Sequence, residues 1–352
     1  MKSFRSYLVV LTIALLIGAL LSCSNPASSP AKAKAWVVST IAGSSTSGTA
    51  DGQGTSARFS DPKGVAVDAA GNLYVADHYH NRIRKITPGG VVSTIAGSDK
   101  TDNDIINGTT HRDGAGDQAL FRGPRGVAVD EDGNVYVADS LNNRIRKLEP
   151  PDEDATSYTV STITIEDDNG SAITLSSPTG VAVDKDDNLY VVEYNNNRIR
   201  KLTKSESDEG SDSGEGSDSD EGSDSDEGSE SDESSESDES ATYTVSPIAG
   251  SSLGFRDHNT GTSAQFYYPH GVAVDKDGNL YVADYYNNRI RKITKSESGG
   301  SVTYAVSTIG GRTSAGSSFG YENGPGNDAR FNNPYGVWRG GGFMGQCLCR
   351  RY

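Results

Sequence analysis

The sequence is poor in cysteine. Its three cysteines are Cys23, Cys347 and Cys349, so the long stretch between the first two contains none. Disulfides therefore cannot cross-link the folded part, and its stability must come from packing. Long apolar runs are also scarce, and the run from Leu8 to Leu21 is too short for a comfortable membrane span.

The beginning of the chain has the pattern of an export signal. Lys2 and Arg5 precede the apolar run, which closes in "LLSC" with the cysteine at Cys23. This pattern resembles the signal peptides of bacterial lipoproteins, which implies lipidation of Cys23. An ordinary cleaved signal or an uncleaved anchor is the alternative. Ser24 rather than Asp after the cysteine favours the outer membrane.

These features predict an exported, lipid-anchored protein that is periplasmic or surface-facing. The membrane would be a partner only through the lipid. Nucleic acid is not expected as a partner, because export argues against it. The predicted segments are a signal peptide at residues 1–22 and a flexible "SNPASSPAKAKA" tether within residues 23–35.

Basic residues are absent from one long segment, residues 205–240, which consists of Ser, Asp, Glu and Gly. It holds 17 of the 48 acidic residues, and without it 31 acidic residues face 32 basic ones. The net charge of -16 therefore describes this segment rather than the rest of the chain. With almost no apolar side chains it is expected to be a disordered insert. Its role is either that of an inert spacer or that of a weak Ca²⁺ sink.

The remainder is dominated by an internal repeat, which reads "GVAVDAAGNLYVADHYHNRIRKI" in its first copy. Copies begin at Gly64, Gly126, Gly180 and Gly271, and Val-Ser-Thr-Ile-like segments stand between them. Each unit therefore offers four short strands rich in β-branched and aromatic residues. In "DxxGN" the Asp and the Gly suit a tight hairpin turn, and Asp187 replaces the glycine in the third copy.

Units of four strands cannot bury both faces alone, so several must pack around an axis as a β-propeller. The units resemble NHL repeats, whose hallmark "PxGVAVDxxGNLYVADxxNNRI" stands almost unchanged at Pro62, Pro124, Pro178 and Pro269. We therefore expect an all-β propeller of four-stranded NHL blades over residues 36–337. The resemblance implies that a ring of about six blades is usual. Four units are complete and a fifth is truncated, so the ring is expected to be incomplete.

A linking segment "DGxGxxAxF" precedes several units and ends at Phe59, Phe121 and Phe331, whereas the third unit lacks it. The first Val-Ser-Thr-Ile segment has no inner strands before it. In a closed ring it would complete the last blade as a strap.

One face of the propeller is expected to carry the ligand site. The loops before the inner-strand glycine and after "YVAD" share a face, and there the copies differ most. Differences between copies of a uniform repeat are typical of a site built on a scaffold. The candidate residues are Lys63, His78, Tyr79, His80, Arg125, Tyr194, His270, Tyr285 and Tyr286.

Three motifs have a structural and a functional interpretation. The "DEDGN" at Asp130 resembles a calcium loop, but it lacks the remaining ligands and fits a hairpin turn. His78 and His80 are half of a zinc site or ordinary loop histidines. The "RIRK" arginines form a basic surface, or they pair with repeated aspartates such as Asp77 and Asp139.

Two classes of function fit these observations. The first is a non-catalytic cell-envelope scaffold that binds protein, peptide or glycan on the variable face. The second is a metal-dependent propeller enzyme that resembles lactonases or amidating-type lyases. Near-identical inner strands offer no distinctive set of ligands, so binding is the prediction, with no catalytic residue, metal or cofactor.

The last residues, 338–352, fit a shifted reading frame better than a site. Back-translated with suitable synonymous codons and read one base later, they give "GVAVDSWGNVYVAD", which is the repeat. We therefore expect a frameshifted tail, in which Cys347 and Cys349 carry no function.

Overall fold

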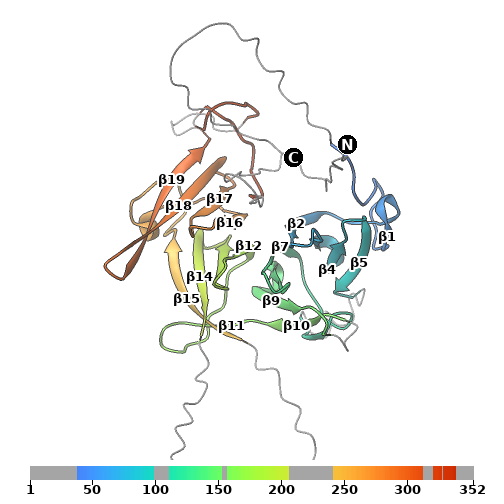
Figure 1. Cartoon of the computed structure of the whole chain (residues 1–352). Helices are drawn as coiled ribbons and strands as arrows, with labels where there is room; N and C mark the ends of the chain where they lie inside the picture. Colours follow the sequence, from blue (N-terminus) through green and yellow to red (C-terminus); the bar gives the residue numbers. More distant parts are fainter. Residues whose placement is uncertain are drawn as a thin grey trace, which may run out of the picture.

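A computed structural model of the chain describes residues 38–98, 111–152, 157–205, 241–311, 320–326 and 328–337. Over these residues the fold consists of four sheets arranged in an arc around an axis (Figure 1). The first and the fourth sheets lie at the two ends of the arc. None of the helices in this part of the chain has the length and apolar character needed to cross a membrane.

The sheets follow the repeats in sequence order. The first has the order β1-β5-β4-β3-β2, with β1 Gly52–Gln53, β2 Pro62–Val67, β3 Leu73–Asp77, β4 Arg82–Ile86 and β5 Val91–Ala96. The second has the order β6-β10-β9-β8-β7, with β6 Gly114–Ala115, β7 Pro124–Val129, β8 Val135–Asp139, β9 Arg144–Glu149 and β10 Thr159–Thr162.

The third and fourth sheets repeat this plan. The third has the order β11-β15-β14-β13-β12, with β11 Thr164–Glu166, β12 Pro178–Val183, β13 Leu189–Glu193, β14 Arg198–Lys204 and β15 Thr242–Ala249. The fourth has the order β16-β17-β18-β19, with β16 Val272–Val274, β17 Leu280–Asp284, β18 Arg289–Ser298 and β19 Ser301–Gly310. Short 3-10 helices lie at η1 Gly54–Ser56, η2 His78–His80, η3 Ser140–Asn142 and η4 Gly261–Ser263.

The Val-Ser-Thr-Ile strands close the sheet of the preceding unit, since β5 pairs with β4 and β19 with β18. The first such segment forms no strand, so the strap expected for a closed ring is not present in the described chain. The outer edge of the fourth sheet is already occupied by β19. Ile41 and Ala42 instead pack against the first sheet beside Phe59.

The turns between the two innermost strands are hairpin turns, as the sequence predicts. Gly133 has φ +88°, and Asp187 adopts the same left-handed region at φ +56°. The Asp130 carboxylate accepts hydrogen bonds from the backbone and side-chain nitrogens of Asn134 and from the Tyr136 hydroxyl, at 2.8, 2.9 and 3.1 Å. The carboxylate is therefore used within the turn.

Each sheet has two apolar faces because the side chains of a strand alternate. We call one the aliphatic face, represented in the first sheet by Val65, Leu73, Val75 and Ile86. We call the other the tyrosine face, represented there by Ala66, Tyr74, Ala76 and Ile83. The aliphatic face of each later sheet packs on the tyrosine face of the sheet before it. Each aliphatic side chain buried in this way contributes about 1.5–3 kcal/mol.

The inner strands meet at the axis through glycine. A Cβ atom on Gly126 would lie 2.8 Å from the Thr179 carbonyl oxygen and 2.9 Å from the Gly180 Cα. The fifth unit contributes the next position, because Gly271 would meet Gly336 at 2.9 Å in the same way. Val337 also packs on the tyrosine face of the fourth sheet. The prediction of four complete units and the start of a fifth is thereby confirmed.

Several predicted features lie outside the described residues. They are the signal peptide and tether with Cys23, residues 206–240 of the acidic insert, and the tail of residues 338–352 with Cys347 and Cys349.

Candidate binding surface

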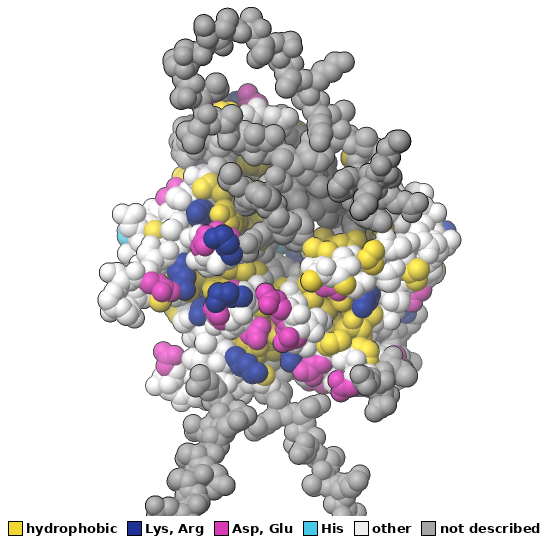
Figure 2. All heavy atoms as spheres, in the orientation of Figure 1, with side chains coloured by type: hydrophobic (Ala, Val, Ile, Leu, Met, Phe, Trp, Pro, Cys, Tyr) yellow, Lys and Arg dark blue, Asp and Glu magenta, His cyan; other side chains and the backbone are white. Residues whose placement is uncertain are grey.

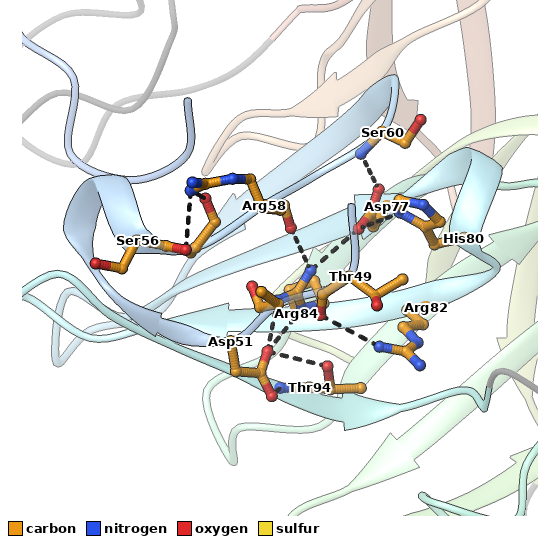
Figure 3. A network of polar contacts seen from close by, with 12 residues as sticks. Thr49, Asp51, Ser56, Arg58, Ser60, Asp77, His80, Arg82, Arg84 and Thr94 are labelled. Carbon is orange, nitrogen blue, oxygen red and sulfur yellow. Dashed lines mark hydrogen bonds and ion pairs between the residues drawn. The ribbon is translucent and has the colours of Figure 1, made fainter. Parts of the chain in front are cut away.

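The second arginine of each "RIRK" strand belongs to the scaffold, and in the first, second and fourth sheets it is fully buried. The Arg84 guanidinium donates to Asp77 Oδ2 at 3.1 Å and to the Arg58 and Ala50 carbonyl oxygens at 2.9 Å each. Figure 3 shows that Asp51 lies on the side of Arg84 away from Asp77. The Asp51 carboxylate accepts hydrogen bonds from Arg84 and from the Thr94 hydroxyl. Since Arg84 and Asp77 are fully buried, this pair is not available to a ligand.

The same cage recurs in the second sheet around Arg146, with Asp139 and Asp113, and in the fourth around Arg291, with Asp284 and Asp257. The predicted pairing of these arginines with the repeated aspartates is confirmed. In the first and second sheets the "DGxGxxAxF" segment thus supplies an aspartate and one backbone carbonyl to the cage. In the third sheet, which lacks that segment, Arg200 pairs with Glu193 at 2.7 Å.

Five residues that precede the axial glycines converge near the axis and differ in every unit. They are Lys63, Arg125, Thr179, His270 and Tyr335. Arg125 Nη1 lies 3.4 Å from the Tyr335 hydroxyl, and Lys63 Nζ lies 5.4 Å from the centre of the same ring. The Thr179 hydroxyl donates to the His270 carbonyl oxygen at 3.1 Å. The first and second sheets therefore face the fifth unit across the axis.

Aromatic rings form a contiguous group beside these residues. We call it the aromatic cluster, and it consists of Tyr194, Tyr267, Tyr268, His270, Tyr285, Tyr286 and Tyr335. His270 stacks on Tyr335 with ring centroids 4.2 Å apart, and Tyr194 stacks on Tyr268 at 4.5 Å. Tyr286, which is 46% exposed, presents the cluster to solvent. Offset and edge-on contacts of this kind stabilise aromatic pairs by about 0.5–1.5 kcal/mol each.

Tyr268 has an unfavourable backbone conformation. Its φ is +48°, in the left-handed region that costs a residue with a side chain roughly 1–2 kcal/mol. Every unit has this conformation at the equivalent position, where the other residues are Asp61, Gly123, Ser177 and Asn333. These are residues that are small or tolerate the left-handed region. A tyrosine here is therefore unfavourable for the backbone and is held by the rings around it.

A cavity of about 230 Å³ lies along the axis. Lys63, Arg125, Thr179 and Tyr335 line it together with the axial glycines. Residues of the aliphatic face of the first sheet, among them Val65, Val75 and Ile86, form another part of its wall. The cavity thus combines two cationic side chains with aromatic and apolar surface.

The electrostatic field near the axis is positive. Burial, together with the charges of Arg125 and Lys63, lowers the pKa of His270 to about 3. The pKa of His78 is also lowered, first by burial and then by the same two cations. Both imidazoles are therefore neutral at pH 7.

The structure brings together six of the nine predicted site residues. Lys63, Arg125, Tyr194, His270, Tyr285 and Tyr286 lie around the cavity and the aromatic cluster. The other three lie apart, in the 3-10 helix η2 of the first sheet. Tyr79 is 70% exposed, His78 Nδ1 lies 3.2 Å from the Pro124 carbonyl oxygen, and His80 Nδ1 lies 3.3 Å from Asp77 Oδ2.

Among the described residues, no group of three His, Cys, Asp or Glu side chains could hold a metal ion. On the face shown in Figure 2, hydrophobic side chains gather over the first sheet, and acidic and basic side chains are interspersed over the sheets that follow.

Tyr267 and Tyr268 are part of the cluster but were not predicted from the sequence. They stand between Phe266 and Pro269, just before the segment in which differences between the units were compared. The signal was present, because the corresponding residues of the other units are small or polar.

The repeats of this chain match a known family of protein repeats. The family model of the NHL repeat matches residues 59–86, 121–148, 175–202 and 266–293. Each match starts two residues before the residue with the left-handed conformation and ends in the "RIRK" strand. The chain therefore contains four NHL repeats, which form its propeller-like, all-β fold.

Particular relatives are more distant. NHL repeat-containing protein 2 of Gallus gallus is 33% identical over 105 residues, which are 29% of this chain and 14% of that protein. The chain spans about a seventh of the length of the first curated relatives it matches.

Among solved structures, an auxiliary nutrient binding protein from Bacteroides ovatus aligns with 86% of this chain over 71% of its own length, with 14% identity and a TM-score of 0.45. A streptogramin B lyase aligns with 70% of this chain over 54% of its own length, with 15% identity and a TM-score of 0.38. These likenesses concern the fold alone.

Proposed function

We propose that the protein is a non-catalytic binding protein of the bacterial cell envelope, and that its ligand, a protein, peptide or glycan, docks on the aromatic cluster. The observation that carries this proposal is Tyr268. A bulky side chain is kept at a position where every other unit has a residue suited to the left-handed region. The scaffold of the other units forms without a tyrosine at this position, whereas the Tyr268 ring completes a continuous aromatic surface.

The composition of the surface suits recognition. Tyrosine provides a large, rigid contact area with a polar tip, and it is enriched among the residues that contribute most to binding. The rings come from the third, fourth and fifth units, so that a ligand would contact several blades at once. The scaffold below them is fixed by the buried arginine cages.

Location in the envelope rests on the sequence around Cys23. We propose that Cys23 is lipidated and that the protein is anchored in the outer membrane. Incorporation of labelled palmitate that is lost in Cys23→Ser, together with release of that variant into the soluble fraction, is the expected result. Retention of Cys23→Ser in the membrane without label would contradict it.

A metal-dependent propeller enzyme is the alternative function. It requires ligand side chains that converge from several blades. Elemental analysis after chelation and dialysis tests this alternative, because a stoichiometric metal that survives the treatment would favour the enzyme.

The test of the proposed function is direct binding. The purified protein is titrated with cell-envelope polysaccharides and with envelope peptides, and each variant is compared by its dissociation constant. Tyr286→Ala should weaken binding by about tenfold or more, as removal of an interface tyrosine commonly does. Tyr79→Ala is the matched control, because Tyr79 is an exposed tyrosine outside the cluster. Equal effects of both substitutions would overturn the proposal.

A further inference from the structure

The axial cavity contains a cation without a balancing anion. Lys63 is paired with Asp61 at 2.8 Å. No carboxylate among the described residues forms an ion pair with Arg125, whose polar partner is the Tyr335 hydroxyl at 3.4 Å. Its Nε is buried and, within the described part of the chain, has no hydrogen-bond acceptor. A buried donor of this kind is costly unless an acceptor is supplied.

The surroundings of Arg125 do not supply that acceptor. His270 is neutral at pH 7, and its Nδ1 is buried with no hydrogen-bond partner among the described residues. The Thr179 hydroxyl is engaged with the His270 carbonyl oxygen. The net charge at this end of the axis is therefore close to one positive charge, which comes from Arg125.

The guanidinium also lies next to the aromatic surface. Tyr335 contacts Arg125 through its hydroxyl and stacks on His270 through its ring, and so joins the cavity to the aromatic cluster. A ligand that contacts both Arg125 and the aromatic cluster therefore lies against the Tyr335 ring. Such a ligand needs an anionic group and, beside it, a ring that can lie against an aromatic side chain.

We infer that this site binds the carboxylate of an acidic sugar residue within a polysaccharide. Arg125 receives the carboxylate, because its planar fork of N–H donors matches two carboxylate oxygens. The C–H face of the sugar ring lies against the tyrosines, and its hydroxyl groups reach the phenol oxygens. One unbalanced positive charge suits a singly charged carboxylate better than a phosphate dianion. This inference rests on the proposed function and specifies its ligand.

The experiment compares one polymer with and without its charge. The full chain is titrated by calorimetry with polygalacturonate and with fully methyl-esterified polygalacturonate, which has the same rings and no carboxylate. Alginate and hyaluronate serve as further acidic probes. At least one acidic polymer should bind, and polygalacturonate should bind about 10- to 100-fold more tightly than its ester, as expected for a charge-assisted hydrogen-bonded pair.

Substitutions identify the residue. Arg125→Gln should remove the preference for the acid and leave binding of the ester unchanged, whereas Arg125→Lys should retain part of the preference. Arg122→Gln is the matched control, because Arg122 is exposed and precedes the same strand. Thermal unfolding of each variant shows that the fold is kept. If Arg125→Gln does not fold, the Arg125→Lys variant and the salt dependence of wild-type binding provide the comparison.

The outcomes separate the two proposals. Equal binding of the acid and the ester would overturn the acidic-sugar inference and leave the proposed function standing. Absence of binding to all three acidic polymers, or binding of an acidic peptide in their place, would overturn the inference as well. The proposed function fails if binding depends on Tyr286 no more than on Tyr79.

Discussion

The side-chain oxygen of Asn81 accepts a hydrogen bond from the backbone amide of Gly123, which lies 2.8 Å away in the next unit. The link recurs at the same distance in every unit, from Ser177 to Asn143, from Tyr268 to Asn197 and from Asn333 to Asn288. All four asparagines have a left-handed backbone, with φ between +51° and +57°. The Asn immediately before each "RIRK" strand is thus an inter-sheet link, and through Asn288 it also fixes the start of the fifth unit.

Substitution of one of these asparagines isolates the link. Asn143→Gly keeps the backbone conformation and removes only the hydrogen bond, so we expect a loss of about 1 kcal/mol in the free energy of unfolding. Asp187→Gly is the matched control, since Asp187 has a similar φ in a hairpin turn where the three other units have glycine. It should be neutral or slightly stabilising. Denaturant titration measures both, and equal losses would contradict the link.

The buried arginine cages should contribute much more to stability than the pair of the third sheet. Arg146→Met leaves Asp139 fully buried without its cation, which costs about 3–5 kcal/mol. Arg200→Met should cost less, because Glu193 keeps Arg198 as a partner and Arg200 is partly exposed. Denaturant titration of the two variants is the measurement. A cost for Arg200→Met as large as that for Arg146→Met would refute this difference.

Features that depend on residues within one unit were predicted from the sequence, whereas features that depend on how segments and units pack together were not. The strands, the "DxxGN" turns and the stacking of units follow from local patterns, so the repeat predicts them. The pairing of Arg84 with Asp77 was also predicted, because both residues belong to one unit. The contribution of Asp51 was not, since it lies in the segment before that unit and meets Arg84 only after folding. The aromatic cluster likewise depends on how three units are placed around the axis.

Relief of the strain at Tyr268 should separate stability from binding. Tyr268→Asn places at this position the residue found at Asn333, which tolerates φ near +50°. The gain in backbone energy, about 1 kcal/mol, is opposed by the loss of ring contacts with Tyr194 and Tyr286, so stability should change little. Affinity for the ligand should fall. A loss of more than about 3 kcal/mol in denaturant titration would indicate that the tyrosine is structural instead.

Stability should decrease in acid because of His270. Its pKa of about 3 in the folded protein is below the ordinary value of 6.5, so the unfolded chain takes up the proton first as the pH falls. The stabilising difference is complete above pH 6.5, and it decreases by up to about 1.4 kcal/mol per pH unit between 6.5 and 3. His270→Gln should flatten this part of the profile, whereas His258→Gln, at an exposed histidine, should not. Parallel profiles for wild type and His270→Gln would disprove the assignment.

The acidic insert should be dispensable for folding. The strands β14 and β15 that flank it pair up to Lys204 and Tyr243, and the Ser205 amide still donates to the Thr242 carbonyl oxygen at 2.9 Å. In the fourth sheet the equivalent strands are joined by Gly299–Gly300 alone, with φ +57° and +78°.

Replacement of residues 206–241 by Gly-Gly should therefore preserve the fold and stabilise it by about 2 kcal/mol, because the shorter connection costs less closure entropy. The variant also loses all 17 acidic residues of the segment, so any weak Ca²⁺ uptake should disappear with it. Thermal unfolding and calorimetry with CaCl₂ are the measurements. An unfolding temperature lowered by several degrees would show that the segment contributes to the propeller.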